Sequence, residues 1–405
     1  MIGASKAPVT LQKDKMSSFD VIVIGGGMAG VAITYHLARL GAKTLLLEKN
    51  ELGSGSTAGC AGRVQVSEAQ PGLNLQLVQL GLARWVELEA ELELDLGWGR
   101  HGNLLLIDSE AQWADWSKRS EWFSRLGLQI ELVSRADLGR LEPGLDSTGF
   151  LGAVYDQAEG HCDPFKFVFG YARQARRYGA VIRQHCPVVG FEMAGQRLTG
   201  VKTVAETFGA AQVVLAAGAW SPQLGQLMGV VLPLQHSHAE AIITERVAPL
   251  VRHHIGLADF YETIHNSPQA VSVGFRQLPN GSILITEAVD AHLHFQRRNT
   301  AWGPAGIAAD LLKLFPALDR VRVVRSWARP TPFAADEQPL IGRLPAWDNL
   351  YAALYFHLSL TTLPIVSALI AAEVLGQPVE PALTPFAPAR FYQNQKPVEF
   401  AGVGR

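Results

Sequence analysis

The sequence is poor in cysteine and has no long run of like charge. Its three cysteines, Cys60, Cys162 and Cys186, are an odd number without a CxxC pair. This argues against a disulfide framework and a zinc finger, and favours a reducing, cytoplasmic location. The 35 Lys and Arg nearly balance the 37 Asp and Glu, for a net charge of −2. Nucleic-acid binding through bulk charge is therefore not expected.

A signal peptide is not expected either. Residues 1–17 have no apolar core of the kind that secretory signals carry, and they and residues 396–405 are expected to be loose termini. Residues 350–372 are uncharged, so a hydrophobicity test would flag a membrane helix there. The same segment contains Pro364 and hydroxyl residues. We prefer the alternative of a strand, a turn and a buried helix, and predict no transmembrane segment.

What the N-terminal part does contain is the order strand, glycine-rich turn, helix, strand and acid. Residues 19–24 are a short β-branched apolar run, typical of a strand buried on both faces. The turn 25–30 leads into a helical pattern at residues 31–40, and a second apolar strand at 43–47 ends at Glu48. This order is typical of a dinucleotide-binding unit.

Each glycine of the turn has a mechanical role in such a unit. Gly25 permits the tight turn, Gly27 lets the backbone approach a pyrophosphate, and Gly30 lets the helix pack closely on the strand. The helix N-terminus offers free N–H groups to the diphosphate. Glu48 is placed to accept hydrogen bonds from the ribose hydroxyls. We predict a single dinucleotide site here.

A second glycine-rich stretch, residues 97–102, fits the same letter pattern. It follows an acidic helical stretch at 87–95 and precedes an apolar strand at 103–107. This order is the reverse of the one that holds a phosphate on a helix N-terminus, so we predict a loop.

The segment from Gly53 to Gly62 is small and rich in hydroxyl groups. Such a loop can wrap a diphosphate or a flavin with backbone N–H and Ser or Thr donors, whereas a simple NAD dehydrogenase would enter another helix here. The segment favours FAD over NAD. The alternative is a flexible surface loop without a ligand.

Five segments in order resemble the glycine oxidase, sarcosine oxidase and D-amino acid dehydrogenase family of FAD enzymes. They are the glycine turn, GHCDP at 160–164, VVLAAGAWS at 213–221, PLIG at 339–342 and NLYAA at 349–353. Within the family, the likeness is greatest to catalytic subunits of heteromeric opine, proline and sarcosine dehydrogenases. The resemblance implies an α/β plus α+β fold: a Rossmann-like FAD domain of the glutathione-reductase type and a substrate domain on a mixed or antiparallel sheet.

The element order divides the 405 residues, 48% of them hydrophobic, into two interleaved domains. An Asn280-Gly281 turn predicts a hairpin over residues 275–285 in the substrate domain. The expected boundaries are 18–97, 151–235 and 325–395 for the FAD domain, and 98–150 and 236–324 for the substrate domain.

A helix is expected after Asp163, with Asp163 as N-cap and Pro164 at the first position. The apolar residues expected to face inward are Phe165, Val168, Phe169, Ala172 and Ala175.

The sequence departs from the family pattern where some relatives attach flavin covalently. Gly59 stands at the position of their attachment His, and all three cysteines precede residue 190, away from the C-terminal strands where others use a Cys. We predict non-covalent FAD.

A second departure concerns the substrate. Many relatives place an Arg against the substrate carboxylate at the position of Thr331, and here Arg329 lies two residues earlier on the same strand face. Arg329 either binds the carboxylate through its two-donor fork or forms a structural ion pair. Arg276 and Tyr261, on a predicted antiparallel strand system, and His357 are further substrate-orienting candidates.

A third departure is in the last flavin segment, which is rich in glycine in relatives. The helix after it should still point N–H groups at the flavin. Leu358 and Leu360 replace glycines, and are expected to narrow the space over the ring. The resemblance and the glycine turn together give the predicted cofactor-binding residues: Gly25, Gly27, Met28, Ala29, Gly30, Glu48, Lys49, Ser56, Thr57, Gly62, Arg63, Val188, Ala217, Gly218, Trp220, Gly342, His357, Leu358, Ser359, Leu360 and Thr361.

Histidine pairs at 236/238, 253/254 and 292/294 lack a third ligand at a sensible spacing, so no metal site is predicted. The resemblance implies oxidation of the C–N bond of an amino acid or secondary amine. A hydride passes to flavin N5, and the resulting imine is hydrolysed by water. It also implies partner subunits that carry a further redox group, with FMN at an interface if the enzyme is heteromeric.

Two alternatives stay open. An FAD monooxygenase would usually show a Gly-Asp pair near the C-terminal strand, where this chain has Gly342-Arg343. A subunit that holds FAD only structurally would fit the lost arginine and glycines.

Overall fold

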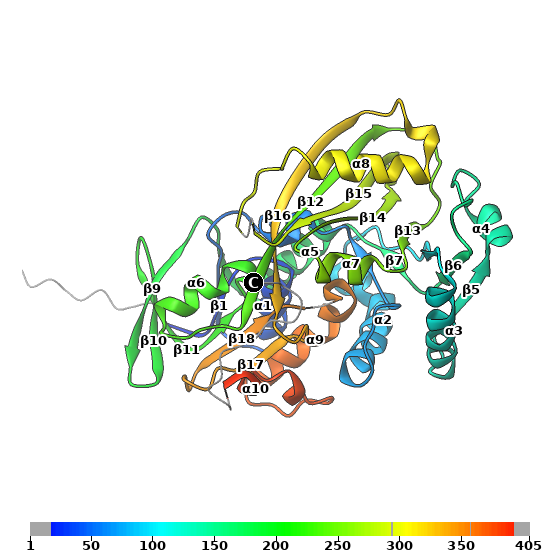
Figure 1. Cartoon of the computed structure of the whole chain (residues 1–405). Helices are drawn as coiled ribbons and strands as arrows, with labels where there is room; N and C mark the ends of the chain where they lie inside the picture. The colour runs from blue at the N-terminus through cyan, green and yellow to red at the C-terminus, as the bar shows by residue number, and fades with distance from the viewer. Residues whose placement is uncertain (1–17, 293–294, 357, 393–405) are drawn as a thin grey trace, which may run out of the picture.

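The computed structural model describes residues 18–392 except 293, 294 and 357, and two large sheets dominate it (Figure 1). The expectations for residues 1–17 and 396–405 and for His357 therefore lie outside the described residues. Each sheet contains eight of the described strands.

The first sheet places β1 (Ser18–Ile24) between two parallel neighbours, β2 (Thr44–Leu47) and β11 (Thr207–Leu215). β8 continues the parallel part beyond β2, and β18 continues it beyond β11. Antiparallel strands complete the sheet. The bounds of these outer strands are Val181–Arg183 (β8), Val188–Ala194 (β9), Arg197–Thr203 (β10), Leu340–Arg343 (β17) and Leu350–Leu354 (β18).

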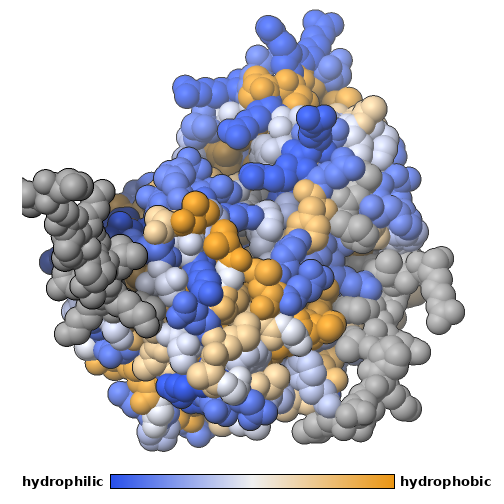
Figure 2. Space-filling view, turned by 90° about the vertical axis from the view of Figure 1, so that its left-hand side faces the viewer, coloured by the Kyte–Doolittle hydropathy of each residue, from blue (hydrophilic) through white to orange (hydrophobic). Residues whose placement is uncertain are grey.

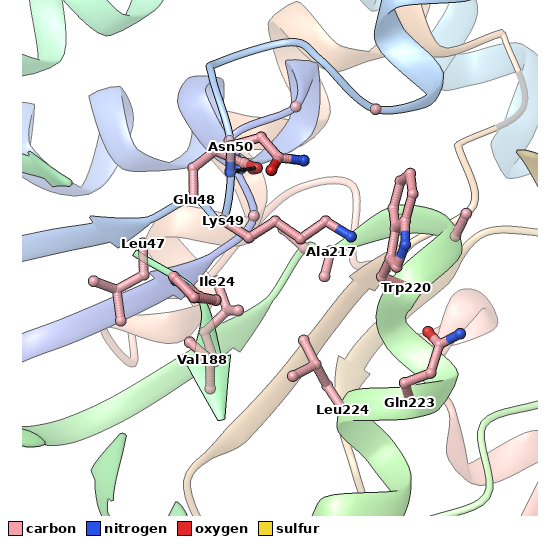
Figure 3. Close-up of a pocket in the computed structure, with 18 of the residues that line it drawn as sticks. Ile24, Leu47, Glu48, Lys49, Asn50, Val188, Ala217, Trp220, Gln223 and Leu224 are labelled. Carbon is pink, nitrogen blue, oxygen red and sulfur yellow. Dashed lines mark hydrogen bonds between the residues drawn. The ribbon is translucent and has the colours of Figure 1, made fainter. Parts of the chain in front are cut away.

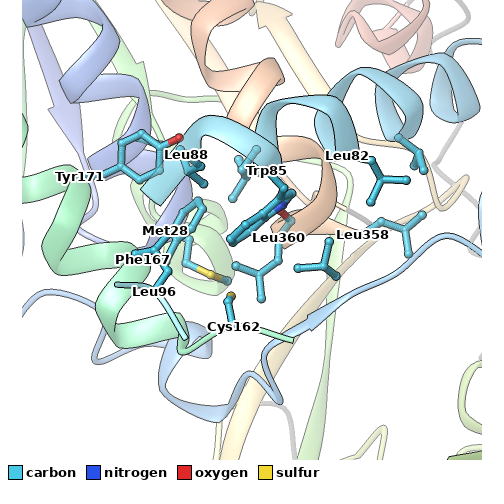
Figure 4. Close-up of a cluster of buried hydrophobic side chains, with 14 of the residues drawn as sticks. Met28, Leu82, Trp85, Leu88, Leu96, Cys162, Phe167, Tyr171, Leu358 and Leu360 are labelled. Carbon is cyan, nitrogen blue, oxygen red and sulfur yellow. The ribbon is translucent and has the colours of Figure 1, made fainter. Parts of the chain in front are cut away.

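Helices pack together on this sheet. α1 (Met28–Arg39) contacts both α5 (Pro164–Arg177) and α9 (Ser359–Val374), and α2 (Leu73–Leu92) packs on α9. Their apolar side chains meet around Trp85 of α2 (Figure 4). The buried Trp85 indole also donates a hydrogen bond of 2.8 Å to the carbonyl of Leu360, so the start of α9 is fixed to α2.

The second sheet has the order β16-β12-β15-β14-β13-β4-β6-β5, antiparallel except for the β13–β4 pair. α8 (Gly303–Leu314) lies along β12, β14 and β15, and buries Ile307 and Leu311 against the sheet. The strand bounds are Asn103–Ile107 (β4), Ile130–Ser134 (β5), Gly152–Asp156 (β6), Leu234–Arg246 (β12), His254–Leu257 (β13), Gln269–Gln277 (β14), Ser282–Asp290 (β15) and Val323–Ala334 (β16).

The remaining described elements lie outside the two large sheets. The helices among them are η1 (Ser56–Gly59), α3 (Glu110–Arg125), α4 (Arg135–Leu141), η2 (Gly218–Trp220), α6 (Ser221–Leu227), α7 (Phe260–Asn266), η3 (Pro316–Leu318), η4 (Thr384–Phe386) and α10 (Ala389–Tyr392). β3 (Arg63–Val64) and β7 (Gly160–His161) form a separate two-stranded sheet.

Most local predictions are confirmed. β1, α1 and β2 occur in the expected order, residues 97–102 are a loop, and β14 and β15 form the hairpin. Residues 350–372 form β18 and most of α9, and no described helix is long and apolar enough to cross a membrane. The predicted combination of a Rossmann-like sheet with a second, mixed sheet is also confirmed. β6 and β16 belong to the second sheet, and the exact domain boundaries stay a prediction.

The expected inward face of α5 is partly wrong. Asp163 caps the helix as expected, and Val168, Ala172 and Ala175 are buried. Phe165 and Phe169, however, are 40% and 51% exposed and stack on each other. The buried stripe runs through Phe167, Val168, Tyr171, Ala172 and Ala175, and residues 165 and 169 lie off it on the helical wheel.

The expectation that Tyr261 lies on a strand is also wrong, because this residue belongs to α7, which packs against β14. The side chain of Tyr261 lies outside the described part of the structure.

Candidate active site

The glycine turn between β1 and α1 is as tight as the sequence predicts. Gly25 has φ +113°, a conformation that side chains rarely tolerate. A β-carbon at Gly30 would lie 1.9 Å from the carbonyl oxygen of Gly25, so α1 approaches the turn as closely as glycine allows. Gly27, the N-cap residue of α1, has no side chain to cap the helix, and of the first-turn amides only that of Met28 donates to a described side chain, at 3.3 Å to Thr57. The positive end of the helix dipole and the N–H groups of the first turn suit an anionic ligand such as a diphosphate.

The carboxylate of Glu48 braces this turn from the end of β2. One oxygen accepts a hydrogen bond of 2.7 Å from the amide of Gly26, and the other accepts one of 2.8 Å from the amide of Asn50. These bonds fix the acid at the edge of the sheet where the turn opens. A ribose bound there would meet a hydrogen-bond acceptor, the Glu48 carboxylate, that is partly buried and already fixed in position.

A cavity of about 570 Å³ lies at this edge of the first sheet (Figure 3). Because Leu227 of α6 lines it and is also exposed, the cavity reaches the surface. Figure 2 shows the face with β9, β10 and α6, on which apolar side chains are scattered among hydrophilic ones. Predicted cofactor residues that line the cavity are Gly25, Gly27, Glu48, Lys49, Ser56, Thr57, Val188, Ala217, Gly218 and Trp220.

Other residues of this wall were not predicted from the sequence. Asn50 follows the acid by two residues, and Gln223 and Leu224 come from α6, directly after the predicted Trp220 (Figure 3). Ile24 and Leu47, the last residues of β1 and β2, also line the cavity. Their positions were a usable signal: Ile24 and Leu47 end the strands before the glycine turn and Glu48, and α6 follows the VVLAAGAWS segment. The carboxyl ends of parallel strands meet at one edge of the sheet.

Two cavity residues from distant segments contact each other. The ammonium of Lys49 lies 3.7 Å from the centre of the Trp220 ring, a cation–π contact, and Figure 3 shows the two side chains pointing toward one another. Burial lowers the pKa of Lys49. The contact joins the end of β2 to η2 across the cavity.

The loop carrying η1 connects this cavity to the second sheet. Thr57 accepts a hydrogen bond of 3.3 Å from the amide of Met28, the first residue of α1. Ser56 donates one of 2.7 Å to the carbonyl of Pro330 on β16. The predicted hydroxyl-rich loop is thus held between the N-terminus of α1 and the second sheet.

Arg329, the next residue on β16, covers the end of η1. A β-carbon at Gly59 would lie 2.0 Å from Arg329 Cδ, so the side chain rests on the backbone of Gly59. Arg329 forms an ion pair of 2.8 Å with Glu287, and the two side chains are 15% and 13% exposed. The structural ion pair foreseen for Arg329 is therefore present, and Nη1 of the same guanidinium is buried without a hydrogen-bond partner in the described structure.

Arg276 of β14 reaches the same loop from the other side. Its Nε donates a hydrogen bond of 3.2 Å to the carbonyl of Ala61, and its Nη2 lies 3.0 Å from the position of a β-carbon at Gly62. Burial lowers the pKa of Arg276. Burial also raises the pKa of the Cys60 thiol, while Arg329 and Arg276 act to lower it, so both arginines lie near that thiol.

A second cavity, of about 520 Å³, adjoins Arg276. Arg252 and four histidines line it, namely His101, His161, His253 and His254. His161 Nε2 is buried and has no hydrogen-bond partner in the described structure. Burial holds the pKa of His161 and of His254 well below the usual value. This wall offers donors to an anionic group.

The other predicted cofactor residues do not line the first cavity. Met28, Ala29 and Gly30 form the start of α1 behind the turn. Arg63 is held by Glu159 at 3.1 Å and by Glu68 at 3.6 Å. Gly342 is on β17 and faces Pro388.

At the start of α9, the side chains are packed or bonded within the protein, so the backbone N–H groups are what this segment can offer to a ligand. Leu358 and Leu360 are buried in the apolar cluster around Trp85 (Figure 4). Thr361 Oγ1 accepts from the amide of Gln65 and donates to its carbonyl, both at 2.8 Å. Leu358, the N-cap residue of α9, makes no side-chain cap hydrogen bond in the described structure, so the first N–H groups of the helix stay available to a ligand.

Histidines of the sequence pairs at 236/238 and 253/254 form side-chain hydrogen bonds, and His294 lies outside the described residues. His238 Nε2 lies 2.9 Å from the carbonyl of Arg298, and His254 Nδ1 lies 2.8 Å from Asn103 Oδ1. Among the residues that the structure describes, no group of three or more His, Cys, Asp or Glu could hold a metal ion.

Comparison with known proteins agrees with this geometry. Residues 20–373 match the model of a family described as FAD dependent oxidoreductase (DAO). The chain is 29% identical over 353 residues to sarcosine oxidase subunit beta of Rhizobium meliloti (strain 1021), which covers 85% of the chain and 81% of that protein.

Two further similar proteins differ in the share of their own length that this chain covers. Human mitochondrial sarcosine dehydrogenase is 28% identical over 84% of the chain, which spans only 38% of that longer protein. The crystal structure of L-proline dehydrogenase from P. horikoshii superposes with a TM-score of 0.84 at 22% identity, and covers 94% of this chain and 99% of that one. This likeness shows a shared fold.

Proposed function

Because the chain belongs to the family of FAD-dependent oxidoreductases, with FAD as cofactor, we propose that it oxidises the carbon–nitrogen bond of an amino acid or secondary amine. The observation that carries the proposal is the pair of arginines, Arg276 and Arg329, beside the cofactor loop at Gly59 and Gly62. A carboxylate-bearing amine has the anionic handle that two guanidinium groups bind. The similarity to a sarcosine oxidase subunit supports the same substrate class.

The residues of the first cavity fit FAD. The tight turn at Gly25 and the N-terminus of α1 suit a diphosphate, and Glu48 suits a ribose. Lys49 and Trp220 line the same cavity, and the uncapped start of α9 would offer further N–H groups to the cofactor. Bound FAD supplies the hydride acceptor; the chain holds the substrate and excludes water.

Arg329 and Arg276 have the task of orienting the substrate. Arg329 would bind the carboxylate through the unpartnered Nη1, and Arg276 would hold the loop at Ala61 and add positive charge. Holding one end of the amine fixes the direction of its reacting C–H bond, which is the main catalytic contribution that a protein makes in hydride transfer.

Anaerobic mixing of the FAD-loaded protein with a panel of amino acids and N-substituted glycines tests the function. Bleaching of the visible flavin absorbance by at least one amine is expected. R329A should weaken substrate binding by about tenfold to a hundredfold, since a charge-assisted hydrogen bond contributes roughly 1.5–3 kcal/mol. Bleaching by NADPH instead of any amine would favour a monooxygenase. No bleaching at all would favour a subunit that only holds FAD.

We further propose that the chain acts in the cytoplasm with a partner subunit that carries another redox group. The second cavity supports this, because its arginines and histidines fit the phosphate of an FMN held at an interface. Three free cysteines among the described residues agree with a reducing compartment. Co-purification with the products of neighbouring genes, followed by extraction and identification of the flavins, tests the partner and the FMN together.

A further inference from the structure

Glu287 lies in the candidate active site although no sequence pattern pointed to it. Its carboxylate is on β15, and it reaches across the intervening strand β12 to Arg329 on β16, with Oε2 at 2.8 Å from Nη2. Neither side chain is fully buried, at 13% and 15% exposure. The ion pair is therefore next to the η1 loop, where Arg329 rests on Gly59.

This ion pair occupies one of the two terminal nitrogens of the Arg329 guanidinium. Nη2 of Arg329 is bound to Glu287, and Nη1 is buried without a partner in the described structure. A ligand carboxylate can thus gain one strong contact to Nη1, while a second carboxylate placed nearby would meet the negative charge of Glu287. A repulsive element of this kind is a common device for selecting between related ligands.

The formal charges around the site also favour a ligand with one carboxylate. Arg276 and Arg329 contact the loop and Glu287 pairs with Arg329, so the formal charges of these three side chains sum to +1. Arg63, the next arginine along the loop, is already paired with Glu159 and Glu68. A monocarboxylic amine in its reactive, unprotonated form carries one negative charge and matches this sum. A dicarboxylic amine carries two.

We propose that Glu287 is a specificity-determining residue that selects monocarboxylic amines and disfavours amines with two carboxylates. The inference rests on the proposed amine oxidation and narrows its substrate class. Sarcosine- and proline-like substrates fit this rule, whereas N-carboxyalkyl amino acids and iminodiacetate do not.

Two unreactive ethers test the inference without turnover. Methoxyacetate and oxydiacetate have the shapes of N-methylglycine and iminodiacetate, and their binding to the oxidised, FAD-loaded protein is followed by the visible flavin spectrum. The wild-type protein should bind methoxyacetate more tightly than oxydiacetate. E287Q should shift the ratio of the two dissociation constants toward oxydiacetate by about tenfold to a hundredfold, because a like-charge contact is removed.

Two further variants make the result specific. E287D keeps the charge and should keep the wild-type preference. E245Q changes a carboxylate of β12 that pairs with Arg322 instead, and should leave the ratio unchanged. FAD content and thermal unfolding report whether each variant is folded.

A folded E287Q protein whose ratio moves by less than about twofold would overturn the inference, as would wild-type preference for oxydiacetate or binding of neither ether. The proposed function fails on a different result, namely that no amine bleaches the flavin of the wild-type protein.

Discussion

The side chain of Arg329 occupies the space above the backbone of Gly59. A β-carbon at residue 59 would lie 2.0 Å from Arg329 Cδ and 2.9 Å from its Nε. The two residues come from η1 and from β16, so their contact joins the η1 loop to the second sheet. Any larger residue at position 59, including a flavin-tethering histidine, would have to displace the arginine.

The first prediction concerns the bond to the cofactor. Since Gly59 offers no side chain and Arg329 fills the space beside it, FAD is expected to be held without a covalent bond. Precipitation of the yellow protein with trichloroacetic acid should leave all of the FAD in the supernatant. Flavin fluorescence that remains on the protein band in a denaturing gel would contradict this prediction.

The second prediction concerns Gly30. G30A should lower the FAD content sharply and destabilise the protein, because the new methyl group would lie 1.9 Å from the carbonyl oxygen of Gly25. Overpacking of this kind typically costs about 1–3 kcal/mol or more. G139A is the matched control, since a β-carbon at that helical position meets nothing within 4 Å. Flavin absorbance per protein and thermal unfolding measure both effects. Equal FAD content in the two variants would refute the role given to Gly30.

The third prediction concerns Glu48. E48A should raise the dissociation constant for FAD by about tenfold to a hundredfold, because it removes the acceptor for the amides of Gly26 and Asn50 and the expected acceptor for the ribose. E51Q, which changes an exposed carboxylate three residues later, should have no such effect. Fluorescence titration of the apoprotein with FAD gives both constants. Wild-type affinity in E48A would exclude a ribose-binding role.

The fourth prediction concerns Asp156, a buried acid at the end of β6. Burial and the neighbouring Glu159 raise the pKa of Asp156 from 3.8 to about 8. The folded protein therefore keeps a proton that the unfolded chain loses above about pH 4. This contribution to stability is complete below that pH and is lost as the pH rises through about 8.

D156N lacks this titration and can still accept the amide of Ala158, which now bonds to Asp156 Oδ1. The free energy of unfolding of D156N should increase relative to wild type between pH 5 and pH 8, by up to about 1.4 kcal/mol for each pH unit. Urea unfolding at several pH values measures the difference. A difference that does not change with pH would show that Asp156 ionises normally in the folded protein.

The cofactor half of the site was predictable because its signals are local. The strand before Gly25, the helix after it and Glu48 lie within one βαβ unit, and each residue type has a mechanical reason to be there. The N-cap role of Asp163 was predictable for the same reason. On α5, residue type alone could not decide which side chains are buried, because the exposed aromatic residues at 165 and 169 are as apolar as the buried Phe167.

The substrate half depends on contacts between distant residues. Sequence spacing placed Arg329 on a strand, but the two interpretations of its role differ only in whether a carboxylate lies nearby. Glu287, 42 residues earlier, supplies that carboxylate through the pairing of β12 with both β15 and β16. No periodicity or spacing in a single sequence specifies which side chains meet across an intervening strand.

The pairing of β1 has a consequence for how the protein is made. β1 leaves the ribosome first among the described strands, yet one of its neighbours is β11, and α1 packs on α9, more than 300 residues later. During synthesis, the edge of β1 that pairs with β11 therefore stays unpaired until β11 has been translated. Nascent chains stopped before residue 207 should therefore retain no FAD and should depend on chaperones to avoid association.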